Sequence, residues 1–177
     1  MKKSTIGWIA LGLSMIVAYS WDSAKTAWIK SGIHLGLDPT AGALLDWNLT
    51  VGMLLIVFLL SLLITLIQKY TTDQVALRAL KKQQKAMQKE MKEAKSDPKK
   101  LASLQKENMA LIPQQFKLSM GSMAYTAIPF VLFFRWFNDY FLAAGNPKFF
   151  GFMGWFIFYL LFSIIFSSVL KKKLDVA

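Results

Sequence analysis

The chain contains no cysteine, one histidine and only ten acidic residues among its 177. Without cysteine it has no disulfide, no thiolate metal site and no thiol nucleophile. His34 has no second histidine or cysteine near it, so the sequence predicts a solvated loop side chain rather than a metal ligand. The chain also lacks a phosphate-binding glycine loop and a nucleophile–base set. We therefore expect neither an enzyme nor a bound metal or cofactor.

Long apolar blocks are what the chain does contain. Residues 6–20, 49–67, 118–141 and 149–170 are nearly free of charge. A helix rises about 1.5 Å per residue and the hydrocarbon core is about 30 Å thick, so about 20 apolar residues span a bilayer. The last three blocks reach that length and predict three core spans. The sequence therefore predicts an all-α membrane protein.

The first block, within residues 1–20, is shorter and follows Lys2 and Lys3. Two interpretations stay open. It is either a retained N-terminal helix, or a signal peptide or anchor with Ala18-Tyr19-Ser20 as a cleavage site. The three core spans have the same topology in both cases.

Basic residues concentrate in the insert at residues 68–117, which holds twelve Lys or Arg against five Asp or Glu. The tail at residues 171–177 adds three lysines, whereas residues 21–48 hold two lysines against three aspartates. Basic segments stay on the cytosolic side of a membrane. We expect a multi-pass plasma-membrane protein with the insert and the C-terminal tail in the cytosol. In the external segment, residues 22–35 predict an interfacial helix, and Asp38-Pro39-Thr40 an exit turn.

The insert has the pattern of two amphipathic helices. Thr71-x-x-Gln74 fits a capping box at the start of the first. Asp97 followed by Pro98 is typical of the start of the second, and Pro113 is expected to end it. Helices joined by so short a turn run antiparallel. The sequence predicts a coiled-coil hairpin between the first two core spans.

The surface of this hairpin is open to two interpretations. Its cations are a solvated face and a topology signal, or they attract ribosomal RNA or acidic lipid headgroups. Its methionines pack inside the hairpin, or they form a soft surface for apolar nascent segments. The candidate partner-binding residues are Arg78, Lys81, Lys82, Lys85, Lys89, Lys92, Met87 and Met91.

Polar residues of the core spans fall on helical stripes and gather in the half of each span nearest the basic segments. Spacings of three and four place each stripe on one face. Helix–helix contact explains any one stripe, whereas a recess open to the cytosol explains why the stripes share one half. The candidate substrate-groove residues are Ser61, Thr65, Gln68, Lys69, Ser119, Ser122, Thr126, Tyr159, Ser163 and Ser167.

Three further residues of the 118–141 span have predicted structural roles. Pro129 lies mid-span, where the missing backbone donor is expected to kink the helix. Arg135 and Asp139 are four residues apart, so we expect them to pair on one face near the outer interface.

Several segments together carry a family resemblance over residues 49–175. They are Leu66-Ile67-Gln68-Lys69-Tyr70 with Thr72-Asp73-Gln74, Leu104-Gln105-Lys106-Glu107, Phe134-Arg135-Trp136, and Trp155-x-x-x-Tyr159-x-x-x-Ser163. In this order of parts the chain resembles the archaeal YidC-like proteins of the YidC/Oxa/Alb insertase superfamily, which also includes the third subunit of the ER membrane complex.

The resemblance implies a membrane protein insertase or chaperone without covalent chemistry. It also implies nascent membrane proteins, and small membrane subunits, as partners. Many relatives have a basic residue in the groove. Here the fourth-span stripe is neutral and Lys69 is the nearest basic candidate, so we expect a neutral polar groove. Two other function classes stay open: a small oligomeric ion channel, and a membrane tether acting through the basic hairpin.

Overall fold

The computed structural model describes residues 3–94 and 97–176, and in these ranges the chain is helical apart from its connections. Ser96, which precedes the predicted helix start at Asp97, is outside the described residues. An isolated bridge between Phe149 and Met153 is the sole strand-like pairing in the described ranges. The elements are α1 (Lys3–Tyr19), α2 (Ala27–Leu37), the π-helix η1 (Asp38–Gly42), α3 (Ala43–Trp47), α4 (Leu49–Thr71), α5 (Gln74–Glu93), α6 (Pro98–Ala143) and α7 (Trp155–Leu174). The predicted all-α class is confirmed.

Two helices, α4 and α7, are long and apolar enough to cross a membrane. A third span results if the two parts of α6, Pro98–Met120 and Tyr125–Ala143, are taken together across a bend of 75°. The structure thus supports two to three membrane-spanning helices.

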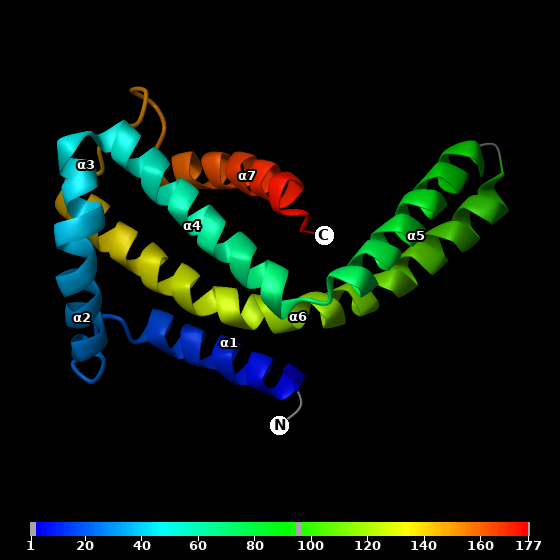
Figure 1. Cartoon of the computed structure of the whole chain (residues 1–177), viewed down its shortest axis with the longest axis horizontal. Coiled ribbons are helices and arrows are strands. Elements are labelled where there is room, and N and C mark those ends of the chain that lie inside the picture. The colour runs from blue at the N-terminus through cyan, green and yellow to red at the C-terminus, as the bar shows by residue number, and fades with distance from the viewer. Residues whose placement is uncertain (1–2, 95–96, 177) are drawn as a thin grey trace.

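The helices divide the molecule into two ends, which Figure 1 shows. α1 lies along α6, and α7 lies along α4. The pair formed by α5 and the first half of α6 projects to one side, here called the hairpin end, and the start of α1 and the end of α7 point toward it. α2, η1 and α3 form a column at the other, the arm end, together with residues 144–154. The basic insert and the basic C-terminal tail therefore lie toward the same end of the molecule.

The arm does not contain the predicted exit turn. Asp38, Pro39 and Thr40 lie inside η1, which continues α2 directly into α3. Pro39 lies in the first turn of η1, and because it lacks an N–H it donates no backbone hydrogen bond to the last turn of α2. The chain turns only at Asn48, whose backbone is extended and whose side chain accepts from the Val51 N–H at 3.0 Å.

The start of α5 differs from the predicted capping box. Asp73 is the N-cap and accepts from the Ala76 N–H at 3.0 Å. Thr71 instead belongs to the last turn of α4, where its hydroxyl donates to the Ile67 carbonyl. Gln74 reaches back over the same turn and donates to the Gln68 carbonyl at 2.9 Å. The capping-box prediction is wrong because the nearer aspartate satisfies the first N–H groups of α5.

The second hairpin helix begins as predicted and ends elsewhere. The Asp97 carboxylate accepts from the N–H groups of Lys99 and Lys100, and Pro98 follows it in the first turn. Pro113, however, lies inside α6, as does Pro129. Pro113 therefore does not end the helix. The 75° bend falls between Met120 and Tyr125, so the kink predicted at Pro129 is displaced toward the hairpin.

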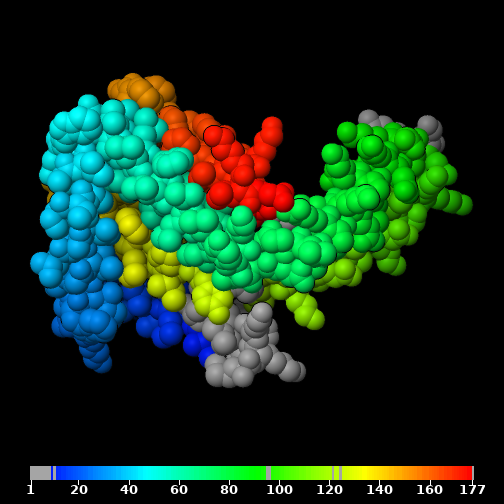
Figure 2. Space-filling model, in the orientation of Figure 1, coloured from blue at the N-terminus to red at the C-terminus, as the bar shows by residue number. Residues whose placement is uncertain are grey.

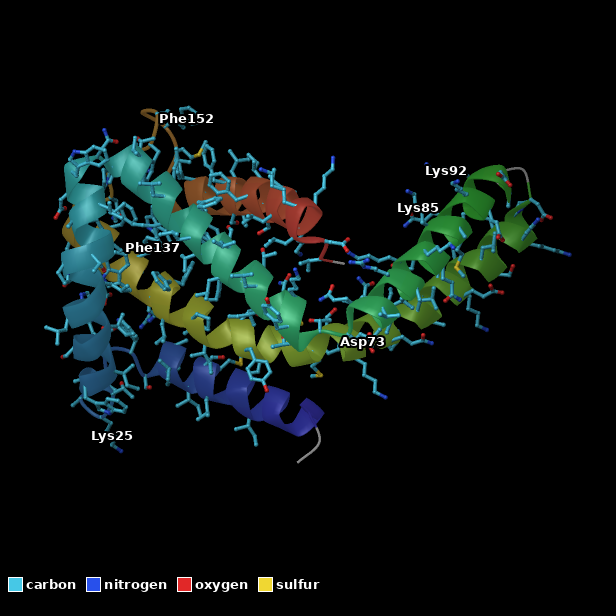
Figure 3. All side chains as sticks on the ribbon, in the orientation of Figure 1. Lys25, Asp73, Lys85, Lys92, Phe137 and Phe152 are labelled. Atoms are coloured by element: carbon cyan, nitrogen blue, oxygen red, sulfur yellow. The ribbon has the colours of Figure 1, made fainter. Side chains whose placement is uncertain are left out.

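Aromatic packing joins α6 to α7 near the arm end. Phe137 lies 6.1 Å, between ring centroids, from both Trp155 and Tyr159. Phe141 stacks nearly parallel on Trp155 at 5.7 Å. Phe137 and Phe141 are fully buried, and Figure 3 labels Phe137 among the packed helices of this end. This aromatic cluster holds the two helices together at one end.

Candidate functional site

A recess opens at the hairpin end, where α4, α5, α6 and the residues around the end of α7 meet. Figure 2 shows the surface hollowed between the end of α7 and the hairpin. The recess has a volume of about 260 Å³. Its lining residues are Gln68, Thr72, Gln74, Leu77, Lys81, Gln115, Ser119, Ser122, Met123, Lys171 and Val176. Amide and hydroxyl groups dominate this lining, so the recess offers hydrogen bonds to a polar chain segment.

Three predicted groove residues, Gln68, Ser119 and Ser122, lie in this lining. Gln68 comes from the last turns of α4, and the two serines come from α6 just before and at its bend. The spacing of Ser119 and Ser122 places both on one side of α6. Helical periodicity is thus the signal that located them.

The deeper residues of the predicted stripes lie outside the recess. Ser61 and Thr65 are buried, and the Thr65 hydroxyl donates to the Ser61 carbonyl at 2.6 Å. The Thr126 hydroxyl donates to the Ser122 carbonyl at 3.1 Å. Such bonds to the preceding turn satisfy a hydroxyl without water. Burial of Ser61 and Thr65 matches the helix-contact interpretation, and the Thr126 hydroxyl is satisfied within its own helix.

The α7 stripe is also absent from the recess lining. Tyr159 is buried, with its ring close to those of Phe130 and Phe137. The Ser163 hydroxyl donates to the Leu160 carbonyl at 2.9 Å. Ser167 and Lys69 are half-buried and do not line the recess. The end of α7, not its middle, forms this wall.

Two lysines line the recess, Lys81 from α5 and Lys171 from the last turn of α7. The prediction of a neutral groove with Lys69 as its nearest cation is therefore wrong. Lys171 belongs to the basic tail, whose charge is a topology signal. Nothing in its local sequence distinguishes that role from lining the recess. Only the packing of α7 against α4 brings it to the recess.

The recess does not continue to the arm end within the described residues. Beyond it, Leu60, Ile64 and the aromatic rings of α6 and Tyr159 enclose a void of about 10 Å³. That is about the volume that one water needs, and the lining offers it almost no polar partner. Among the described residues, the recess thus opens toward the hairpin end, and largely apolar side chains lie between it and the arm end.

A polar network closes the arm end. Asp139 accepts from the Trp21 indole N–H at 2.7 Å, and its carboxylate lies 3.1 Å from Lys30 Nζ. His34 Nε2 lies 3.3 Å from the same carboxylate, while Nδ1 lies 3.1 Å from Asp38. His34 therefore belongs to α2 and contacts two carboxylates, which corrects the prediction of a solvated loop residue.

The predicted pair of Arg135 with Asp139 is not formed. Arg135 instead approaches Asp22 at 3.3 Å, and its guanidinium carbon lies 5.8 Å from the Trp21 ring centre. Arg135 and Asp139 thus both bind the segment that leads into and forms α2. Hydrogen bonds to Asp22 and Asp139 raise the pKa of Lys30 above its usual value, although partial burial opposes the shift. These contacts join residues over 100 positions apart, so no local pattern predicts them.

The hairpin presents its cations outward. The basic residues predicted to bind partners are all exposed, and Figure 3 shows Lys85 and Lys92 on the side of α5 turned away from α6. Met87, in contrast, is buried between the helices with Leu80 and Leu104. For Met87 the structure matches the interpretation that the methionines pack inside the hairpin. Met91 is half-buried and borders a shallow hollow with Gln88, Lys92 and Leu101.

Comparison with known proteins gives a match to a protein family. The family model described as "Integral membrane protein EMC3/TMCO1-like" matches residues 35–150, well over half of the chain. The match runs from the end of α2 through α6 and into the connection before α7. No curated protein and no solved structure matches the chain.

Proposed function

Because the chain belongs to the EMC3/TMCO1-like family of integral membrane proteins, in the setting of the Oxa1/YidC/Alb3 insertase superfamily, we propose that it is a membrane protein insertase. The observation that carries the proposal is the one-sided polar recess, closed by aromatic packing toward the arm end. A polar group left without partners in hydrocarbon costs several kcal/mol. A recess that supplies partners part-way into the membrane lowers that cost.

The proposed mechanism has three steps. The exposed cations of the hairpin first attract the substrate or the ribosome that carries it. Gln115, Ser119 and Ser122 then offer hydrogen bonds to the polar flank of the incoming segment, while Lys81 and Lys171 favour acidic groups in it. The apolar outer surfaces of α4 and α7 finally let the hydrophobic part move sideways into lipid. No covalent chemistry takes part.

We further propose the archaeal YidC-like type of insertase, in the plasma membrane, with hairpin and C-terminal tail in the cytosol. The order of span, basic hairpin, two spans and basic tail supports this assignment, as does the grouping of the basic segments at one end. Nascent membrane proteins are the proposed substrates. The ribosome, acidic lipid headgroups and small membrane subunits are proposed partners of the hairpin and spans.

Reconstitution in vesicles tests the proposal, with a single-span substrate that carries a short polar N-terminal flank. We expect more inserted substrate than in protein-free vesicles, because the recess lowers the barrier to moving the flank. Ser119→Leu with Lys171→Leu removes polar partners from the recess and should lower insertion severalfold. Ser168→Leu is the matched control, since Ser168 is exposed on α7 and its hydroxyl donates to the Ile164 carbonyl. Equal insertion with and without the protein contradicts the proposal.

The same vesicles separate the two rival functions. A channel conducts ions across a planar bilayer without substrate, which a one-sided recess does not allow. A tether loses its activity when the exposed lysines of α5 are replaced, and keeps it when the recess is made apolar. Either result would replace the insertase assignment.

A further inference from the structure

An ion pair joins the hairpin to the segment that follows α7. An Arg78 guanidinium nitrogen on α5 lies 2.7 Å from an Asp175 carboxylate oxygen and also donates to the Asp175 backbone carbonyl. Arg78 lies one helical turn before Lys81, which lines the recess. The contact therefore lies beside the mouth of the recess.

The backbone at this point directs the tail into the mouth. Asp175 has φ +54° and ψ +49°, a left-handed conformation that a residue with a Cβ seldom adopts. The Val176 N–H donates to the Lys171 carbonyl at 2.9 Å, which ends α7 and turns the chain back. Val176 then contributes to the recess lining, where its apolar side chain stands among amides and hydroxyls. The tail thus forms part of the border of the recess.

The charged side chains at the mouth of the recess are mostly basic. Arg78, Lys81 and Lys171 bring three cations to it, and neither lysine forms an ion pair with any described residue. Asp175 is the one acidic side chain that pairs with this group in the described ranges. An anion entering the recess meets these cations and competes with Asp175 for Arg78.

We propose that Asp175 holds, in the protein without substrate, the position beside Arg78 that an acidic residue of an incoming segment takes. The tail then competes with the substrate at the mouth of the recess. Arg78 then selects substrates whose flank carries a carboxylate. The exchange is easy because Asp175 and Arg78 are largely exposed, at 83% and 49% of their side-chain surface, and exposed pairs are weak. This inference rests on the proposed function for its substrate, but the closing of the mouth is a property of the protein alone.

The first experiment measures the mouth without any substrate. Ser119→Cys places a single thiol in the recess, since the chain has no cysteine of its own. Its reaction rate with a polar maleimide reports access. Asp175→Asn should raise the rate about 1.5- to 5-fold, the range expected for losing an exposed ion pair. The exchange Arg78→Asp with Asp175→Arg should restore it, and Glu107→Gln, on the exposed hairpin surface, should leave it unchanged. A rate unaffected by Asp175→Asn overturns the proposal.

The second experiment compares two substrates that differ only by Asp or Asn in the polar flank. Asp175→Asn should increase the insertion rate of the acidic substrate by the same factor of about 1.5 to 5. It should increase the insertion rate of the neutral substrate by a smaller factor. Arg78→Gln should abolish the preference for the acidic substrate.

The two experiments separate the possible failures. If the wild-type protein inserts neither substrate, the proposed function fails, while the maleimide rates still decide whether the tail closes the mouth. If the rates change but the acidic and neutral substrates respond equally, the tail does not compete with a substrate carboxylate and the proposal is wrong.

Discussion

Replacing Gly52 by alanine tests the corner at which the arm turns into α4. A Cβ at Gly52 would lie 2.2 Å from the Leu44 carbonyl oxygen, 2.6 Å from its carbon and 2.9 Å from the Leu45 nitrogen. All three atoms are backbone, so no side chain can rotate away. Forcing extra atoms into a packed site costs about 1–3 kcal/mol, and contact with backbone belongs at the upper end. Alanine is favoured over glycine in a helix by about 0.5–1 kcal/mol. The expected net loss is therefore about 2 kcal/mol.

Thermal unfolding in detergent, followed by tryptophan fluorescence, to which the buried Trp21 and Trp136 contribute, measures this loss. For a chain of this size, about 2 kcal/mol corresponds to a Tm lower by about 4–8 °C. Gly36→Ala is the matched control, because Gly36 lies within α2 and a Cβ there meets nothing within 4 Å. That substitution should leave the Tm equal or slightly higher. A Gly52→Ala protein as stable as the wild type would refute the close approach of α3 to α4.

Two further substitutions probe other contacts. Asp139→Asn removes the charge that Trp21 and Lys30 bind at the arm end, and should lower the free energy of unfolding by about 1.5–3 kcal/mol in the same assay. Asp22→Asn, at a side chain that is 69% exposed, should lower it by less than about 1 kcal/mol. Equal losses would contradict the central place of Asp139. Asp97→Ala removes the N-cap of α6 and should cost the hairpin about 0.5–2 kcal/mol, seen as faster hydrogen exchange in its first turns, while unchanged exchange would show that the cap is dispensable.

Features with a local cause could be predicted from the sequence. The apolar runs that became α4 and α7 follow from bilayer thickness alone, and the Asp97-Pro98 start of α6 follows from capping chemistry. The positions of Ser119 and Ser122 in the recess follow from helical spacing. In each of these, neighbours in the sequence decide the outcome.

Features that depend on distant packing could not be predicted. Asp139 finds its partners in Trp21 and Lys30, although Arg135 is nearer in sequence. Lys171 reaches the recess because α7 packs along α4, and its own neighbours give only a charge signal. Pro113 was a misleading signal for a different reason. A proline removes one backbone hydrogen bond, and packing of the surrounding helix against α5 can outweigh that loss.

The continuity of α6 has a mechanical consequence. The stretch Pro98–Met120 is half of the hairpin, and Gln115 and Ser119 at its far end are part of the recess wall. At about 1.5 Å per residue, the hairpin tip lies about 26 Å from Gln115 along one rod. A large partner that presses on the hairpin tip therefore displaces the recess wall, because the helix pivots at the bend after Met120. A small tilt of the hairpin and a change in the width of the recess are then one and the same movement.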